Sequence, residues 1–169
     1  MKLVRNTGND RVVNLIRPLL RGGQRLDVVT PSLSLFAFAE LLSQLASLGR
    51  CRFVLPADDT KLELFGSEAE RPARNRLQAR WLAAHLGKWL ANNADVRRAS
   101  GVVPQGAFVV RDEADQALQA LLGSLAFSGE GLGLIPCNPL SLIQASETPD
   151  EARLLRARLR MGIPSKQRS

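Results

Sequence analysis

The residues best suited to chemistry lie in one stretch, 120-ALLGSLAFSGEGLGL-134, where Gly123 and Ser124 directly follow an apolar run. Three further glycines come after them: Gly129, Gly131 and Gly133. Bare backbone N–H groups at the start of a helix can bind phosphate oxygens. The same residues suit a strand-to-helix turn, in which glycine permits positive φ and close packing. We favour the turn for the last three glycines, and both interpretations stay open for Gly123 and Ser124.

Other polar groups in the sequence are a poorer basis for a catalytic or metal site. There are two acidic clusters: Asp58, Asp59 and Glu63, and then Asp112, Glu113 and Asp115. Acidic turns are usually solvated, and no histidine lies near either cluster to complete a metal site. The single histidine, His85, falls among apolar residues at helical spacing, which is typical of a core or boundary residue. The sequence therefore predicts no metal and no cofactor.

The composition is that of a basic globular chain. Its 169 residues include 23 Lys and Arg against 16 Asp and Glu, for a net charge of +7. Nearly all the cations are arginines, whose planar guanidinium binds phosphate in a two-pronged manner. A basic surface attracts polyanions such as nucleic acid, but it also serves solubility alone. Aromatic residues make up 5% of the chain, with no tyrosine, so no base-stacking platform is obvious.

Compartment can be inferred from the cysteines and from the apolar segments. Cys51 and Cys137 are far apart in the sequence and lie in apolar surroundings, as small reduced core residues do in cytosolic proteins. The start of the chain lacks the apolar core of a signal peptide. No uninterrupted apolar run reaches the roughly 18 residues of a membrane span. We therefore expect a cytoplasmic protein that makes no contact with a membrane.

The spacing of apolar residues predicts an α/β fold. Strands are expected at 25–30, 50–55, 95–99, 106–111 and 118–127, and helices at 11–20, 35–48, 72–94 and 149–161. Strand, helix and strand joined by short connections are typical of parallel pairing. We expect a mixed, mostly parallel sheet flanked by helices on both faces. Residues 1–161 would form one domain, and residues 162–169 a basic, flexible tail or linker.

The expected helix at 72–94 combines an apolar face with a basic one. Its core face would hold Leu77, Trp81, Leu82, His85, Leu86, Trp89 and Leu90. Cations fall largely elsewhere on the helix or on the strand after it, and the nucleic-acid-binding candidates among them are Arg71, Arg74, Arg76, Arg80, Arg97 and Arg98. Together with Lys88 they make seven cations between residues 71 and 100, against one acid, Asp95. These cations form either a footprint for nucleic acid or merely a solvated face.

The stretch 103–133 resembles the phospholipase D superfamily in the order of its parts. A short strand, an acidic turn and a second strand ending in Gly-Ser precede a phenylalanine and a glycine-rich helix start. The segment RLDVVTPSLSLFAFAELLSQLASLGRCRFVL is similar to that family's opening strand, Ser/Pro turn, helix and second strand. The resemblance implies a phospholipase D-like fold over roughly residues 25–134. In that family a histidine attacks a phosphodiester, while a lysine and the Gly-Ser region hold the phosphate oxygens.

The family's motif is degenerate in this chain. The motif consists of His-x-Lys, four residues, Asp and, after a variable gap, Gly-Ser. Here Gln105 stands at the histidine position and Ala107 at the lysine position, while Asp112, Gly123 and Ser124 match the rest after a longer gap. An amide is not a useful nucleophile, and alanine carries no charge. The resemblance therefore implies the fold together with loss of phosphodiesterase activity.

Domains that resemble this one occur at the N-terminus of bacterial Swi/Snf-type helicase-like proteins. The resemblance thus implies a non-catalytic module of a larger bacterial helicase or DNA-processing protein that binds the nucleic-acid backbone. The sequence has no P-loop motif, so any ATPase would lie on further sequence. Two alternatives stay open: a dimerisation or protein-interaction domain that binds no nucleic acid, and a phosphodiesterase or nuclease active only with a partner subunit. The partners to consider are DNA or RNA, a second copy of the chain, and the remainder of a larger polypeptide.

Overall fold

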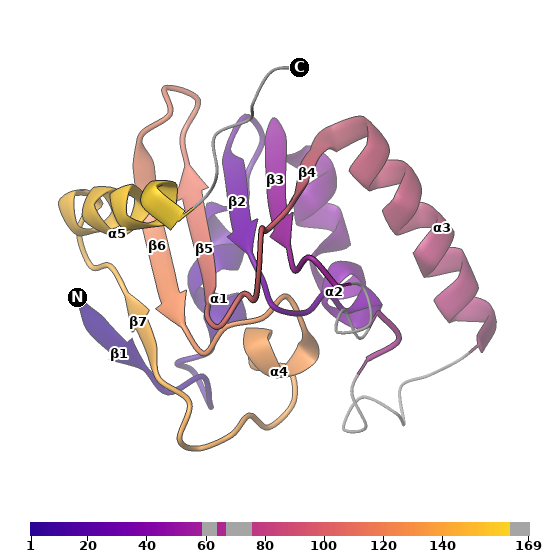
Figure 1. The fold of residues 1–169 in the computed structure, drawn as a ribbon, viewed down its shortest axis with the longest axis horizontal. Helices are drawn as coiled ribbons and strands as arrows, with labels where there is room; N and C mark the ends of the chain where they lie inside the picture. Colours follow the sequence, from indigo (N-terminus) through magenta and orange to yellow (C-terminus); the bar gives the residue numbers. More distant parts are fainter. Residues whose placement is uncertain (59–63, 67–75, 163–169) are drawn as a thin grey trace.

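The computed structural model describes residues 1–58, 64–66 and 76–162, whose strands form one seven-stranded sheet in the order β1-β7-β6-β5-β2-β3-β4 (Figure 1). The strands are β1 (Lys2–Val4), β2 (Arg25–Val29), β3 (Arg50–Leu55), β4 (Ala94–Arg98), β5 (Gly106–Arg111), β6 (Ala117–Gly123) and β7 (Ile143–Ala145). The helices are α1 (Val12–Ile16), the 3₁₀ turn η1 (Arg17–Leu19), α2 (Leu35–Ser47), α3 (Arg76–Asn93), α4 (Gly129–Leu132) and α5 (Pro149–Gly162). The predicted α/β class is therefore confirmed.

The prediction of a mostly parallel sheet is wrong. In the described part of the chain only β2–β3 and β3–β4 pair in parallel, whereas β5 pairs antiparallel with both β2 and β6, and β7 with both β6 and β1. The physical reason is the short connection 99–105 between β4 and β5. A crossover that returns the chain to the far end of a sheet needs a dozen or more residues. The strand β5 therefore starts at the end of the sheet where β4 stops, and it runs in the opposite direction.

One face of the sheet carries the larger apolar core. Alternate residues of β2, β3, β5 and β6 point toward α1, α2 and α3, and the largest buried side chains there include Phe38, Phe53, Phe108 and Phe127. Phe127 meets both Phe53 and Phe108 edge-on, with ring centroids 5.4 and 6.2 Å apart. Burial of side chains of this size contributes roughly 1.5–3 kcal/mol each, which explains why this face organises the fold.

The helix α5 packs against the opposite face, in front of β5 and β6 (Figure 1). The interface is small and is formed by Val109, Ala117, Ala120, Ala152 and Leu155. Short side chains let the helix approach the sheet closely. With α1 and α2 behind the sheet and α5 in front of it, helices lie on both faces, as the sequence predicted.

The N-terminal segment differs from the prediction in two respects. The edge strand β1 was not predicted, and the helix expected at 11–20 is shortened to α1 followed by η1 at Pro18. The side chain of Asn6, 3% exposed, accepts a hydrogen bond from the Val12 N–H at 2.9 Å and donates to two carbonyls of α4. A buried amide thus joins the first turn of α1 to α4.

Candidate functional site

The motif residues meet at one end of the sheet, with one exception. In the β5–β6 hairpin Gly106 lies opposite Gly123 and Ala107 opposite Leu122, so Gln105 and Ser124 are brought to the same end. Asp112 lies beyond the other end of β5, where its carboxylate accepts a hydrogen bond from the Gln116 N–H at 2.8 Å. Its observed role is to close the hairpin turn.

Gly123 is required by close packing of the backbone. Its φ is +135°, and a Cβ at this position would lie 2.1 Å from the carbonyl oxygen of Leu142. Strand β6 therefore ends at Gly123, rather than at residue 127 as expected, because β7 closes against it here. The bare backbone of Gly123 faces another segment of the chain and not a ligand site. Of the two interpretations that the sequence left open, the structure supports close packing at this residue.

A cavity of about 290 Å³ lies beside Ser124. Its lining is rich in hydroxyl groups and consists of Pro31, Ser32, Pro104, Ser124, Leu125, Ala126, Ser128, Glu130, Gly131, Cys137, Asn138 and Ser141. This lining includes the carboxylate of Glu130 and neither lysine nor arginine. The hydroxyl of Ser124 accepts a hydrogen bond from the Leu142 N–H at 3.3 Å. A phosphate in this cavity would meet one negative group and no cation among the described lining residues, so the cavity is a poor anion site.

A second cavity of about 290 Å³ lies beside Gln105, the residue that the resemblance aligns with the family's nucleophile. The loop 99–103 and Val54 form one side of it, and Leu159 and Arg158 of α5 form the other. Ala107 is 1% exposed and pairs with Val29, a residue that lines this cavity, so its side chain points to the same face of the sheet. The two motif positions thus offer an amide and a methyl group where the family's chemistry needs an imidazole and an amine. Arg158 supplies one cation but no nucleophile.

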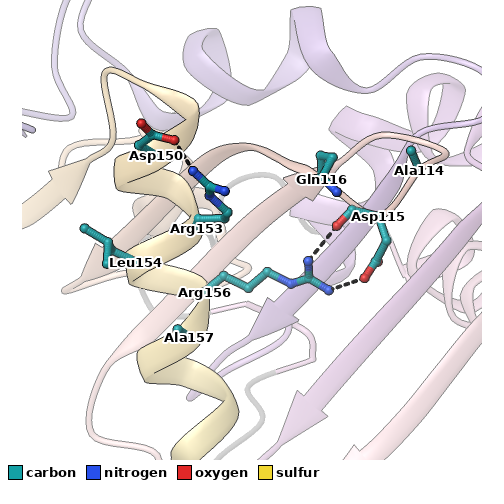
Figure 2. Close-up of a pocket in the computed structure, with 8 residues that line it drawn as sticks. All are labelled: Ala114, Asp115, Gln116, Asp150, Arg153, Leu154, Arg156 and Ala157. Carbon is teal, nitrogen blue, oxygen red and sulfur yellow. Dashed lines mark hydrogen bonds and ion pairs between the residues drawn. The ribbon is translucent and has the colours of Figure 1, made fainter.

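An open groove of about 650 Å³ lies between the β5–β6 turn and α5 (Figure 2). Arg156 points from α5 toward the turn and donates to the Asp115 carboxylate at 2.7 Å and to the Asp115 carbonyl at 2.6 Å. Arg153 pairs with Asp150 along the helix itself. The hydrogen bond from Arg156, assisted by Arg111 and opposed by partial burial, lowers the pKa of Asp115 to about 2. Arg156 and Asp115 thus join α5 to the β5–β6 hairpin.

Arg111 is the most deeply buried member of this network, with its side chain 8% exposed. It donates to Asp27 of β2 at 2.7 Å and also pairs with Asp115. Burial alone would lower its pKa, but the charges and hydrogen bonds of Asp27 and Asp115 outweigh burial and raise it. The neighbouring Cys51 thiol has its pKa raised to about 12, first by burial and then by the charge of Asp27. A thiol with so high a pKa is a core group and not a nucleophile.

Of the predicted basic candidates, those whose side chains the structure describes are divided between the two faces of the sheet. Arg71 and Arg74 lie outside the described residues, and Arg76 is the first residue of α3. Arg80 is exposed on α3. Arg97 and Arg98 are neighbours on β4 and therefore point to opposite faces of the sheet.

These two β4 arginines also differ in their partners. Arg97 lies on the α5 side and pairs with Asp95 at 2.9 Å, and Asp95 also pairs with Arg52. Arg98 lies on the α3 side and donates to the Pro56 carbonyl at 3.0 Å. The face that carries Arg98 is thus the one shared with α3.

Sequence reasoning placed Trp81 and His85 in the core, and the structure exposes both. Among the α3 side chains that the structure describes, those of residues 79–93, the buried ones are Ala79, Leu82, Leu86 and Trp89. Trp81, His85, Lys88 and Asn92 follow one another at helical spacing along an adjacent exposed side, which we call the α3 stripe. The signal that could have revealed it is the width of the apolar pattern, since one helix face cannot bury residues on more than half of the circumference.

Further searches added no family assignment. No protein-family model matches the chain, and no curated protein matches it significantly.

Across the described side chains, no group of three or more His, Cys, Asp or Glu could hold a metal ion. None of the described helices combines the length and the apolar character needed to cross a membrane. The resemblance to the phospholipase D superfamily therefore rests on the residues themselves.

Proposed function

We propose that the chain is a non-catalytic, phospholipase D-like module of a larger bacterial helicase or DNA-processing protein, and that it binds the nucleic-acid backbone through α3. The observation that carries the proposal is the charge of this helix. Residues 76–93 contain no Asp or Glu, and Arg80 and Lys88 are both exposed. A surface with cations and no acid attracts a polyanion over a distance of about a Debye length.

The proposal assigns no catalysis to the motif end of the sheet. Gln105 and Ala107 replace the two groups that would attack and hold a phosphodiester. The cavity beside Ser124 has a carboxylate and no cation in its described lining. Phosphate would thus be held at α3, by charge alone, and would leave unchanged.

Binding to a fluorescent duplex and to a fluorescent single strand across a salt series tests this function. Each phosphate neutralised contributes a log–log salt slope of roughly −0.9 on duplex DNA and −0.7 on a single strand. We expect salt-dependent binding, with both oligonucleotides recovered uncut from the same samples. Absence of binding at low salt would overturn the function, and cleavage would overturn its non-catalytic part.

A pair of charge-reversed variants locates the site. Arg80→Glu combined with Lys88→Glu reverses two exposed cations of α3, and we expect at least a roughly tenfold loss of affinity and a salt slope smaller by about 2. The matched control is Arg153→Glu with Arg158→Glu, which changes the charge equally on exposed positions of α5, across the sheet. A loss confined to the control would place the binding site on the α5 face instead.

A protein-interaction domain is the second candidate, and a specific observation favours it. Leu3 and Leu142 are 64% and 67% exposed. Leu3 and Leu122 lie on the sheet face that α5 covers only in part, because Gln144 pairs with both, and Leu142 directly precedes β7. Sedimentation across a concentration series, with Leu3→Glu and Leu142→Glu, tests this candidate. It predicts self-association that the substitutions abolish and that nucleic acid does not affect.

A further inference from the structure

The exposed indole of Trp81 is the least expected feature of α3. The residue is 57% exposed, whereas Trp89, two turns further along, is 7% exposed. Leaving so large an aromatic side chain mostly in water forgoes much of the free energy that its burial would contribute. An exposed tryptophan flanked by polar groups is characteristic of recognition surfaces.

The indole is held in place from its inner side. His85 stacks on Trp81 with ring centroids 5.0 Å apart and an angle of 19° between the ring planes. Phe38 of α2, which is fully buried, lies behind His85 at 6.2 Å and contacts Trp89 at 5.7 Å. A chain of rings thus extends from the core to the surface and ends in the indole. A flat group that binds the indole would find it already oriented, so little conformational entropy is lost on binding.

The groups around the indole favour an anionic ligand with flat rings. Lys88 follows one further turn along the α3 stripe, Arg80 is adjacent to Trp81 in sequence, and the helix contains no acid to repel a phosphate. Asn92, at the end of the stripe, can both donate and accept hydrogen bonds. An aromatic ring beside cations on a backbone-tracking surface is how proteins bind single strands, since each base has a π-face. A paired base has no free face inside a duplex.

We propose that the α3 stripe (Trp81, His85, Lys88 and Asn92) is a binding site for single-stranded nucleic acid. An unpaired base stacks on the exposed indole of Trp81, and Lys88 neutralises a neighbouring phosphate. The inference rests on the proposed function and deepens it, because it specifies that the bound nucleic acid is single-stranded and names the residue on which its base stacks. It also assigns a role to His85, which positions the indole and does not itself contact the base.

Substitution of Trp81 in the full chain, with a 15-nucleotide oligo-dT strand and a duplex of equal length, tests the inference. Trp81→Ala should lower the affinity for the single strand roughly tenfold or more, the effect of one lost base stack. The duplex affinity should change less than about twofold, and the salt slope should stay the same because no charge is removed. Trp81→Phe keeps an aromatic face and should retain most of the affinity. Leu154→Ala, at a residue 68% exposed on α5, is the control for loss of an exposed apolar side chain.

The two tryptophans allow a direct readout of stacking. In Trp89→Phe the remaining fluorescence comes from Trp81, and oligo-dT should quench it; in Trp81→Phe the buried Trp89 remains, and quenching should be lost. If both nucleic acids bind with a salt-dependent affinity that Trp81→Ala leaves unchanged, the stacking site is wrong while the backbone function stands. Failure of both nucleic acids to bind at low salt overturns the two together. A change in Trp81 emission that follows protein concentration without oligonucleotide would mean that a second copy covers the stripe, and would also overturn the inference.

Discussion

The two faces of the sheet hold their helices by different means. Toward α2 and α3, aromatic rings such as Phe53, Phe108 and Phe127 pack edge to face and are fully buried. Toward α5, the apolar contact consists mainly of alanines, and the helix is fixed by a charged pair, Arg156 of α5 with Asp115 of the hairpin turn, which also pairs with Arg111 of β5. The first interface depends on buried area, and the second on the direction and pairing of charges.

This difference separates the contacts that stabilise the fold from the contacts that set the position of α5. Apolar burial is non-directional and large, so the α2 and α3 side supplies most of the stability. Hydrogen bonds between charged groups contribute less each, but they specify geometry. We therefore expect α5 to detach from the sheet under conditions that leave the aromatic core intact.

The largest effect is expected from Phe108→Ala. The side chain is 0% exposed and contacts Phe127 in the centre of the aromatic face, so its removal leaves a cavity. The free energy of unfolding should fall by about 3–5 kcal/mol, as measured by urea denaturation. Leu154→Ala on the outer side of α5 serves as the control and should stay within about 0.5 kcal/mol. Equal effects of the two substitutions would contradict the assignment of stability to the aromatic face.

A smaller loss is expected from Arg111→Met on the α5 side. The substitution keeps the aliphatic stem but leaves Asp27, whose side chain is 19% exposed, without its 2.7 Å partner. We expect a loss of about 2–4 kcal/mol, because an uncompensated and largely buried charge is costly. Adding Asp27→Leu should recover part of this loss. Arg25→Met is the matched control, since Arg25 is 37% exposed and lies 3.7 Å from Asp115. If the double variant were no more stable than Arg111→Met, the penalty would come from packing rather than from charge.

Asp115→Asn should cost about 1 kcal/mol at pH 7, since its side chain is 41% exposed and solvent screens the ion pairs. The pKa of Asp115 is lowered to about 2, against about 3.9 in an unfolded chain. The stabilisation is therefore complete above about pH 5 and is lost as the pH falls toward 2. Urea denaturation of both proteins at several pH values should show the difference between them shrinking over that window. A difference that stays constant down to pH 2 would mean that the carboxylate charge is not what holds α5.

The sequence predicted the elements on the aromatic face well. The strand, helix and strand expected at 25–30, 35–48 and 50–55 correspond to β2, α2 and β3 within a residue at each end. The reason is that buried parallel strands and an amphipathic helix have distinct apolar spacing. The strand expected at 106–111 and the acidic turn after it were also found, but their antiparallel pairing with β6 was not predicted. The three-residue edge strand β1 has too few residues for any spacing to be recognised.

Two features of the site depended on contacts that no local pattern contains. The end of β6 at Gly123 is set by β7, which approaches from twenty residues further along. The exposure of Trp81 depends on where α2 lies beside α3, because the apolar residues of α3 exceed what one face can bury. The charged network was also not predicted, since Asp27, Asp115 and Arg156 are far apart in sequence and meet only when β2, the turn and α5 are assembled.

The smallest effect is expected from single substitutions on β4, which compare the two faces of the sheet by their affinity for nucleic acid rather than by their stability. Arg97 and Arg98 have the same charge and adjacent positions on β4, but Arg98 shares its face with α3 while Arg97 points to the α5 side and pairs with Asp95. If nucleic acid binds over α3, Arg98→Ala should weaken binding about two- to fivefold and reduce the salt slope by about 1. Arg97→Ala should change affinity less than twofold, because its side chain points to the opposite face of the sheet from α3. The comparison is made by fluorescence titration of the same oligonucleotide at three salt concentrations, and each variant serves as the other's control. A larger loss for Arg97→Ala would place the nucleic acid on the α5 face and would contradict the binding role proposed for α3.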